Sequence, residues 1–182
     1  MLKIILGIIF ALVATFFTVG FFSPEINYRT SVDIEAPLDH TFAVYNDTTR
    51  MGEWLEGFIS LSAVSGEANE VGSEWLMTFE GPDGAPIEMH ETVTAFVENE
   101  HFGFTIDSDM MEAASDVRFS ALDGNRTRIE ANTTSRGKSL MWRSMLRLMH
   151  GSIAQQDVAN HERLKALVES TPLAQPDSTS GI

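Results

Sequence analysis

The chain contains no cysteine and few basic residues. Its 182 residues include 12 lysines and arginines against 26 aspartates and glutamates, which gives a net charge of −14. Without cysteine there are no disulfides, thiolate nucleophiles or cysteine-ligated metals. The acidic balance argues against nucleic acid as a partner, because a phosphate backbone needs a basic surface. The same charge disfavours flat binding of the whole domain to anionic lipid.

Recognisable enzyme motifs are also missing. The sequence has no glycine-rich phosphate loop, nucleophile elbow, HExxH helix or EF-hand loop. His150 and His161 fall on one predicted helix, but about 16 Å apart, which is too far for one metal ion. We therefore predict no metal site and no cofactor, and the sequence leaves open whether the protein is an enzyme.

One long apolar run, residues 4–22, lies between Lys3 and Glu25. At about 1.5 Å per residue, a helix of this length spans roughly 28 Å, close to the thickness of a bilayer's hydrocarbon core. The alternative is a cleaved secretory signal, which needs small residues before its cleavage site, where this chain has Phe21 and Phe22. We predict a transmembrane anchor, or an uncleaved signal, over residues 1–24.

The charges around this run predict a single-pass orientation. Lysines and arginines near a membrane span stay on the cytoplasmic side, whereas long acidic domains cross readily. We therefore expect Lys3 and the amino terminus in the cytoplasm, and the domain on the outer, periplasmic or extracellular, side.

The remainder reads as one domain, residues 25–170, followed by a disordered tail, residues 171–182, rich in Pro, Ser and Thr. Alternation of apolar and polar residues predicts a first strand. The chain then breaks, Asp39 can cap the first of two short helices, and a run of strands follows. Helical spacing without proline predicts a final long helix capped by Ser139. The predicted strands are 25–35, 58–65, 74–80, 87–97, 102–107, 117–122 and 127–133, and the predicted long helix is 139–170.

This order of elements is an α+β layout. The chain resembles the START-like (helix-grip) SRPBCC superfamily and, within that superfamily, its polyketide cyclase/dehydrase branch. The resemblance covers roughly residues 27–169. It rests on the phrase SVDIEAP at 31–37, DHTFAVY at 39–45, Trp54, GSEW at 72–75 and the closing helix. It implies a curved antiparallel sheet of about six to seven strands wrapped around the long C-terminal helix, with a cavity that holds apolar molecules in relatives.

Glu91 falls on the otherwise apolar face of the predicted strand 87–97. A carboxyl group there is desolvated, which would raise its pKa and let it act as an acid or base, or hold a ligand hydroxyl. The alternative is an ion pair with Arg118 or Arg128. His90 points to the opposite face, so a His90–Glu91 dyad is excluded by geometry.

Aromatic and thioether side chains are the commonest candidates for the cavity wall, although any domain of this size must also bury such residues in its core. With Glu91, they form our predicted ligand-binding set: Trp75, Met77, Phe79, Met89, Glu91, Phe102, Phe104, Phe119, Met145 and Met149.

Three functional hypotheses follow. The first is a membrane-anchored domain that binds an apolar small molecule or lipid, with the membrane contacted through residues 4–22. The second is a cyclase- or isomerase-type enzyme that uses Glu91 as acid or base. The third is a protein-interaction module whose interior is filled. A local cluster of positive charge is either a solvated face or a site for an anion or a partner: Arg136, Lys138, Arg143 and Arg147.

Overall fold

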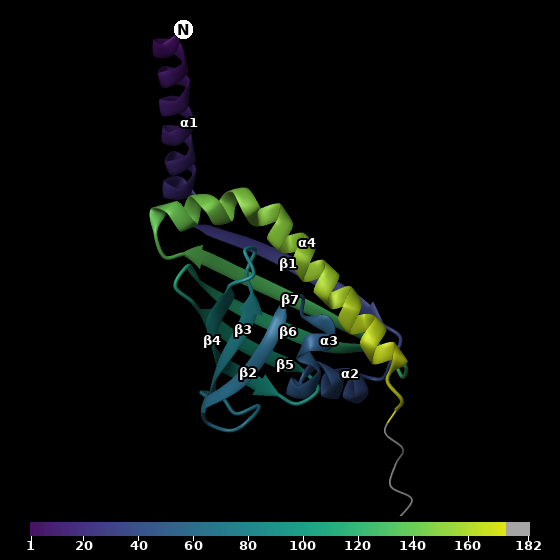
Figure 1. Ribbon diagram of the computed structural model, residues 1–182. Helices are drawn as coiled ribbons and strands as arrows, with labels where there is room; N and C mark the ends of the chain where they lie inside the picture. The colour runs from purple at the N-terminus through teal and green to yellow at the C-terminus, as the bar shows by residue number, and fades with distance from the viewer. Residues whose placement is uncertain (174–182) are drawn as a thin grey trace, which may run out of the picture.

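The computed structural model describes residues 1–173 and shows one antiparallel sheet with a long helix laid across it (Figure 1). Two short helices follow the first strand, and an apolar helix stands apart at the amino terminus. The elements are α1 (Leu2–Phe22), β1 (Glu25–Ile34), α2 (Leu38–Tyr45), η1 (Thr48–Arg50), α3 (Met51–Trp54), β2 (Phe58–Ser65), β3 (Glu74–Glu80), β4 (Pro86–Val97), β5 (His101–Asp107), β6 (Met111–Asp123), β7 (Arg126–Gly137) and α4 (Leu140–Ser170).

The seven strands follow the order β1-β7-β6-β5-β4-β3-β2. Strands β2 to β7 form a meander in which each pairs with its neighbour in sequence, and β1 pairs with β7. Helix α4 follows β7 and packs back onto β1 and β7, so both ends of the domain meet there. This arrangement confirms the predicted helix-grip fold class.

Two details of the prediction are wrong. Strand β6 begins at Met111, six residues before the predicted start at Val117, and β7 continues to Gly137. The added segment of β6 is short of apolar residues, so its sequence shows no clear alternation. It is a strand because it pairs on both sides, with Ala113 opposite Ile106 in β5 and Ser135 in β7.

The helix caps are predicted correctly at one end of the domain and not at the other. Ser139 caps α4, since its side chain accepts a hydrogen bond from Trp142 N at 3.2 Å. Asp39 does not cap α2, because the helix already begins at Leu38. Its cap residue is Pro37, whose carbonyl oxygen accepts the first helical hydrogen bond, from Thr41 N at 2.9 Å. Asp39 lies in the first helical turn instead.

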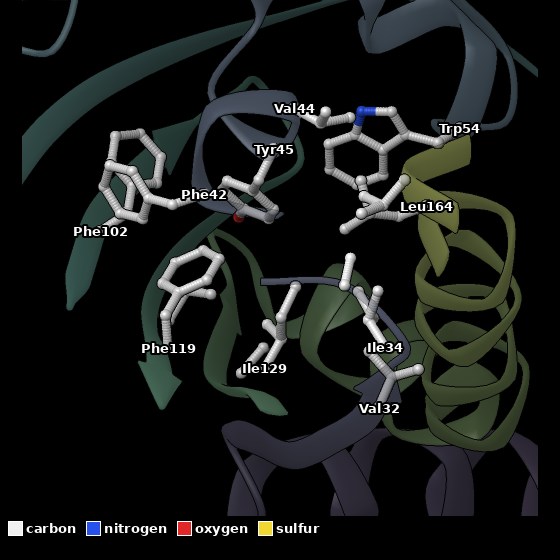
Figure 2. Close-up of a cluster of buried hydrophobic side chains, with 14 of the residues drawn as sticks. Val32, Ile34, Phe42, Val44, Tyr45, Trp54, Phe102, Phe119, Ile129 and Leu164 are labelled. Carbon is white, nitrogen blue, oxygen red and sulfur yellow. The ribbon is translucent and has the colours of Figure 1, made fainter. Parts of the chain in front are cut away.

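The domain core is richest in aromatic residues where α2 packs on the sheet (Figure 2). The ring of Tyr45 contacts Trp54 and Phe119, with ring centroids 5.5 Å and 5.1 Å apart, and Phe42 packs on Phe119 at 4.9 Å. The fully buried Leu164 brings α4 against this cluster. This end of the space between sheet and helix is therefore filled by protein side chains.

Helix α1 is long and apolar enough to cross a bilayer, and almost all of it lies outside the domain (Figure 1). Its last turns contact α4, where Gly20 is buried. At the other end of the chain, the predicted disordered tail falls outside the described residues from position 174 onward.

Candidate functional site

A cavity of about 280 Å³ lies between the sheet and the helices. Strands β3, β4 and β5 provide most of its sheet side, through residues that include Met77, Val93 and Ile106. Tyr45 and Trp54 contribute from the short helices. Apolar atoms dominate the wall, as expected of a site for an apolar ligand.

Seven members of the predicted ligand-binding set line this cavity. Cross-strand pairing brings them together, since Trp75 lies opposite Glu91 and Met77 lies opposite Met89. The strand alternation therefore identified the face of β3, β4 and β5 that lines the cavity. The seven residues are Trp75, Met77, Phe79, Met89, Glu91, Phe102 and Phe104.

The other three members of the predicted set do not line the cavity. Phe119 is 4% exposed and belongs to the aromatic core around Phe42 and Tyr45. Met145 and Met149 are 36% and 45% exposed on the first half of α4. That half of the helix packs on α1 and near the start of β1, at a distance along the helix from the cavity.

Several lining residues were not in the predicted set. Tyr28 lies on β1, where alternation with Ile26 could have identified it. Asn160 reaches the cavity from α4, and Ala68 and Asn69 reach it from the β2–β3 loop. Their positions depend on how distant elements pack, so no local sequence pattern indicates them.

Glu91 is buried in the cavity wall at 5% exposure. Within residues 1–173 no hydrogen bond or ion pair to its carboxyl group is found. Burial raises the pKa of Glu91 from 4.5 to about 7. The alternative ion pairs do not form, because Arg118 pairs with Asp116 at 2.9 Å and Arg128 with Asp33 at 2.7 Å.

A second carboxyl group lies behind the helix side of the cavity. Asp157 of α4 accepts a hydrogen bond from the hydroxyl of Thr30. Burial first, and then the negative charge of Asp157, raise the pKa of Tyr28. Burial, followed by the charges of Glu91 and Asp157, likewise raises the pKa of Tyr45. Both tyrosines, which line the cavity, are therefore neutral phenols at neutral pH.

His161 lies one helical turn after Asp157 and is 5% exposed. Its Nδ1 is 2.8 Å from the backbone oxygen of Asp157, to which it donates, and 3.7 Å from an Asp157 carboxylate oxygen. Its Nε2 is buried and has no hydrogen-bond partner in the described part of the chain. The middle of α4 thus places two polar side chains, Asp157 and His161, at the interior, whereas Leu164 further along the same helix is apolar.

This arrangement allows two kinds of chemistry. A carboxyl group with a pKa about 7 is populated in both protonation states near neutral pH, so it can donate or accept a proton. The same group can hold the polar end of an apolar ligand, because a hydrogen bond there would satisfy an otherwise unpaired buried group.

The fold is shared with solved structures of low sequence identity. The Zhui aromatase/cyclase from Streptomyces sp. R1128 superposes with a TM-score of 0.68 at 10% identity, over 80% of this chain and 94% of that one. The protein TTHA0849 from Thermus thermophilus superposes with a TM-score of 0.65 at 16% identity, over 79% of this chain and 97% of that one. Ara h 8.0201 superposes with a TM-score of 0.65 at 15% identity, over 81% of this chain and 99% of that one.

No curated protein sequence matches this chain significantly. A family model does match, from residue 25 to residue 169, which is nearly the whole domain from β1 to the end of α4. The fold, the apolar cavity and this match agree, and the chain belongs to the family described as polyketide cyclase / dehydrase and lipid transport.

Proposed function

We propose that this protein is a membrane-anchored binding domain for an apolar small molecule or lipid. The observation that carries the proposal is the apolar cavity with Glu91 buried and unpaired in its wall. A buried carboxyl group without a partner costs free energy, and a ligand that hydrogen-bonds to it would remove that cost. The family description, which includes lipid transport, supports the same reading.

The cavity defines the ligand chemistry. Its volume of about 280 Å³ is just below the range of about 300–1,000 Å³ that is usual for small-molecule sites. We therefore expect a compact apolar molecule, or one segment of a longer lipid, packed against Trp75, Met77 and Phe102. One hydroxyl, carbonyl or amine on that molecule would meet Glu91.

Helix α1 provides the proposed tether. Only Ser23 and Pro24 separate it from β1, so the cavity would stay close to the bilayer surface. A tether of this kind raises the effective concentration of a ligand that comes from the membrane. We propose that the amino terminus is cytoplasmic and that the domain lies on the outer side of the membrane.

The proposal is tested by purifying the full chain in lipid nanodiscs and analysing organic extracts and native mass. We expect an apolar molecule bound in a one-to-one ratio, beyond the lipids of empty nanodiscs prepared in parallel. A chain that carries no such molecule and binds no apolar fluorescent probe would contradict the proposal and favour the interaction-module hypothesis.

A cyclase-type enzyme is the second candidate, and the raised pKa of Glu91 favours it. The structural similarity to the Zhui aromatase/cyclase agrees with this reading. Once a ligand is known, E91Q separates the two candidates. A binding protein should lose at most some affinity, whereas an enzyme should lose turnover. Glu88 of the same strand is exposed, so E88Q is the matched control.

A further inference from the structure

The first three turns of α4, residues 140–150, carry a row of exposed apolar side chains. Met141, Met145, Leu148 and Met149 are 48%, 36%, 67% and 45% exposed. Their spacing places them along one side of the helix, which we call the Met–Leu stripe. Leu146, on another side, is buried against the domain. The segment is therefore amphipathic, with an apolar side that nothing in the domain covers.

The charge of this segment differs from that of the rest of the protein. No acidic residue occurs between Glu130 and Asp157, although the chain has 26 of them. The same interval contains four basic residues. Lys138 pairs with Asp107 at 2.6 Å, and Arg143 donates from Nε to Gly137 O at 3.0 Å, whereas the side chain of Arg147 is exposed. The stretch 131–156 is therefore basic in sequence. In the sheet Arg136 lies opposite Glu25 and Glu112, so the exposed basic residue within the stripe segment is Arg147.

Helix α1 contacts this same segment. A Cβ atom added to Gly20 would lie 2.7 Å from Ser144 N and 2.9 Å from Leu140 O, so the two helix backbones approach closely. Ser144 is completely buried at this crossing. In Figure 1, α1 stands upright on the first part of α4, which runs across its end. Phe21 and Phe22, at the end of α1, are 69% and 76% exposed.

We propose that residues 140–149 lie in the headgroup layer of the membrane that α1 crosses, with the Met–Leu stripe inserted among the lipids. The inference rests on the anchoring part of the proposed function. A bilayer is the favoured occupant because α1 itself holds the stripe where a spanning helix leaves the hydrocarbon core. An apolar stripe beside basic side chains is also the composition of helices that lie on anionic membranes.

The contact would fix the domain relative to the membrane. Two connections, the α1 end and the stripe, restrict rotation more than the short link at Ser23 and Pro24 alone. Helix α4 runs from the stripe to Asn160 in the cavity wall, so its axis connects the membrane surface to the proposed ligand site.

The absence of cysteine makes a direct test possible, because one introduced cysteine is the only site for a thiol-reactive dye. We would label L148C with an environment-sensitive fluorophore in the full chain, in vesicles of phosphatidylcholine and phosphatidylglycerol. The control is V158C, which is 46% exposed and lies further along the same helix. We expect a blue-shifted L148C label that aqueous iodide quenches several-fold less than the V158C label. Equal quenching of the two labels would overturn the inference.

A third label, V13C in the middle of α1, separates this inference from the anchor itself. If V13C is protected and L148C is as accessible as V158C, the surface contact is wrong and the anchor stands. If V13C is also accessible, the anchoring proposal fails, and this inference fails with it. Binding of an apolar probe, measured in the same vesicles, reports on the cavity independently of all three labels.

The basic residues predict a dependence on lipid charge. In vesicles of phosphatidylcholine alone, the L148C label should be quenched more than in the mixed vesicles, because the attraction to anionic lipid is lost. Equal protection in both lipids would overturn the role assigned to Arg147 and its basic neighbours.

Discussion

Glu91 lies directly opposite Trp75 in the pairing of β3 and β4, and both residues line the cavity. The indole N–H of Trp75 does not satisfy the carboxyl group, because it donates to Ser73 Oγ at 3.3 Å. Within residues 1–173 no hydrogen bond from another residue reaches the Glu91 carboxyl group, and burial alone raises its pKa. This relationship explains how a carboxyl group can be buried in a sheet and keep its hydrogen-bonding capacity for a ligand.

The stability of the protein should depend on the protonation of Glu91. Burial raises the pKa of Glu91 from 4.5 to about 7, so the folded protein holds this proton more tightly than the unfolded chain does. The stability that the proton provides is complete below the unfolded pKa and is lost as the pH rises through the folded value. The shift corresponds to about 3 kcal/mol in the free energy of unfolding.

E91Q stays neutral and should not show this loss. We expect E91Q to gain stability relative to the wild type as the pH rises from about 5 to about 8. Denaturant unfolding in detergent, followed by tryptophan fluorescence, measures the difference, since all three tryptophans lie in the domain. The control E88Q should show a constant difference from the wild type. If E91Q also differed by a constant amount, Glu91 would not be a buried, unpaired carboxyl group.

Gly20 should be necessary for the packing of α1 on α4. A methyl group there would lie within 3 Å of Ser144 N, whereas a methyl group at Gly7 would meet nothing within 4 Å. We expect G20A to weaken the α1–α4 contact by about 1–3 kcal/mol, as overpacking commonly does, and G7A to leave it unchanged. The readout is the rate at which protease cleaves between α1 and β1. Equal cleavage rates for the two variants would show that the close contact does not form.

Phe119 and Phe104 should affect different properties, although both were in the predicted ligand-binding set. Phe119 is in the core, so F119A should lower the free energy of unfolding by about 3–5 kcal/mol. Phe104 lines the cavity and is only partly buried, so F104A should weaken binding of an apolar probe at a smaller cost in stability. Unfolding and probe titration are measured on both variants. A greater loss of stability in F104A than in F119A would contradict this assignment.

Much of the sheet could be predicted from the sequence because its signal is local. Local sequence patterns predicted strands 58–65 and 74–80 with the observed limits, and alternation placed Met77 and Met89 on the cavity side. The start of β6 was missed because pairing with β5 and β7, and not the pattern within residues 111–116, makes that segment a strand.

The helix residues show the limit of periodicity. The apolar spacing in α4 indicates which residues share a face, but it does not identify what covers that face. Leu164 and Met149 are both apolar residues of this helix, yet Leu164 is fully buried in the core and Met149 is 45% exposed. Asn160 reached the cavity without any local signal, since its role depends on the path of the whole helix across the sheet.

The most direct test of the central claim is a titration of the full chain, in nanodiscs, with an apolar fluorescent probe. The half-buried Met89 lines the cavity, so M89W should fill part of the cavity, whereas V64W adds the same ring at an exposed position on β2. We predict saturable one-to-one binding by the wild type and by V64W, and loss of that binding in folded M89W. Equal binding by M89W and the wild type would show that the cavity is not the ligand site.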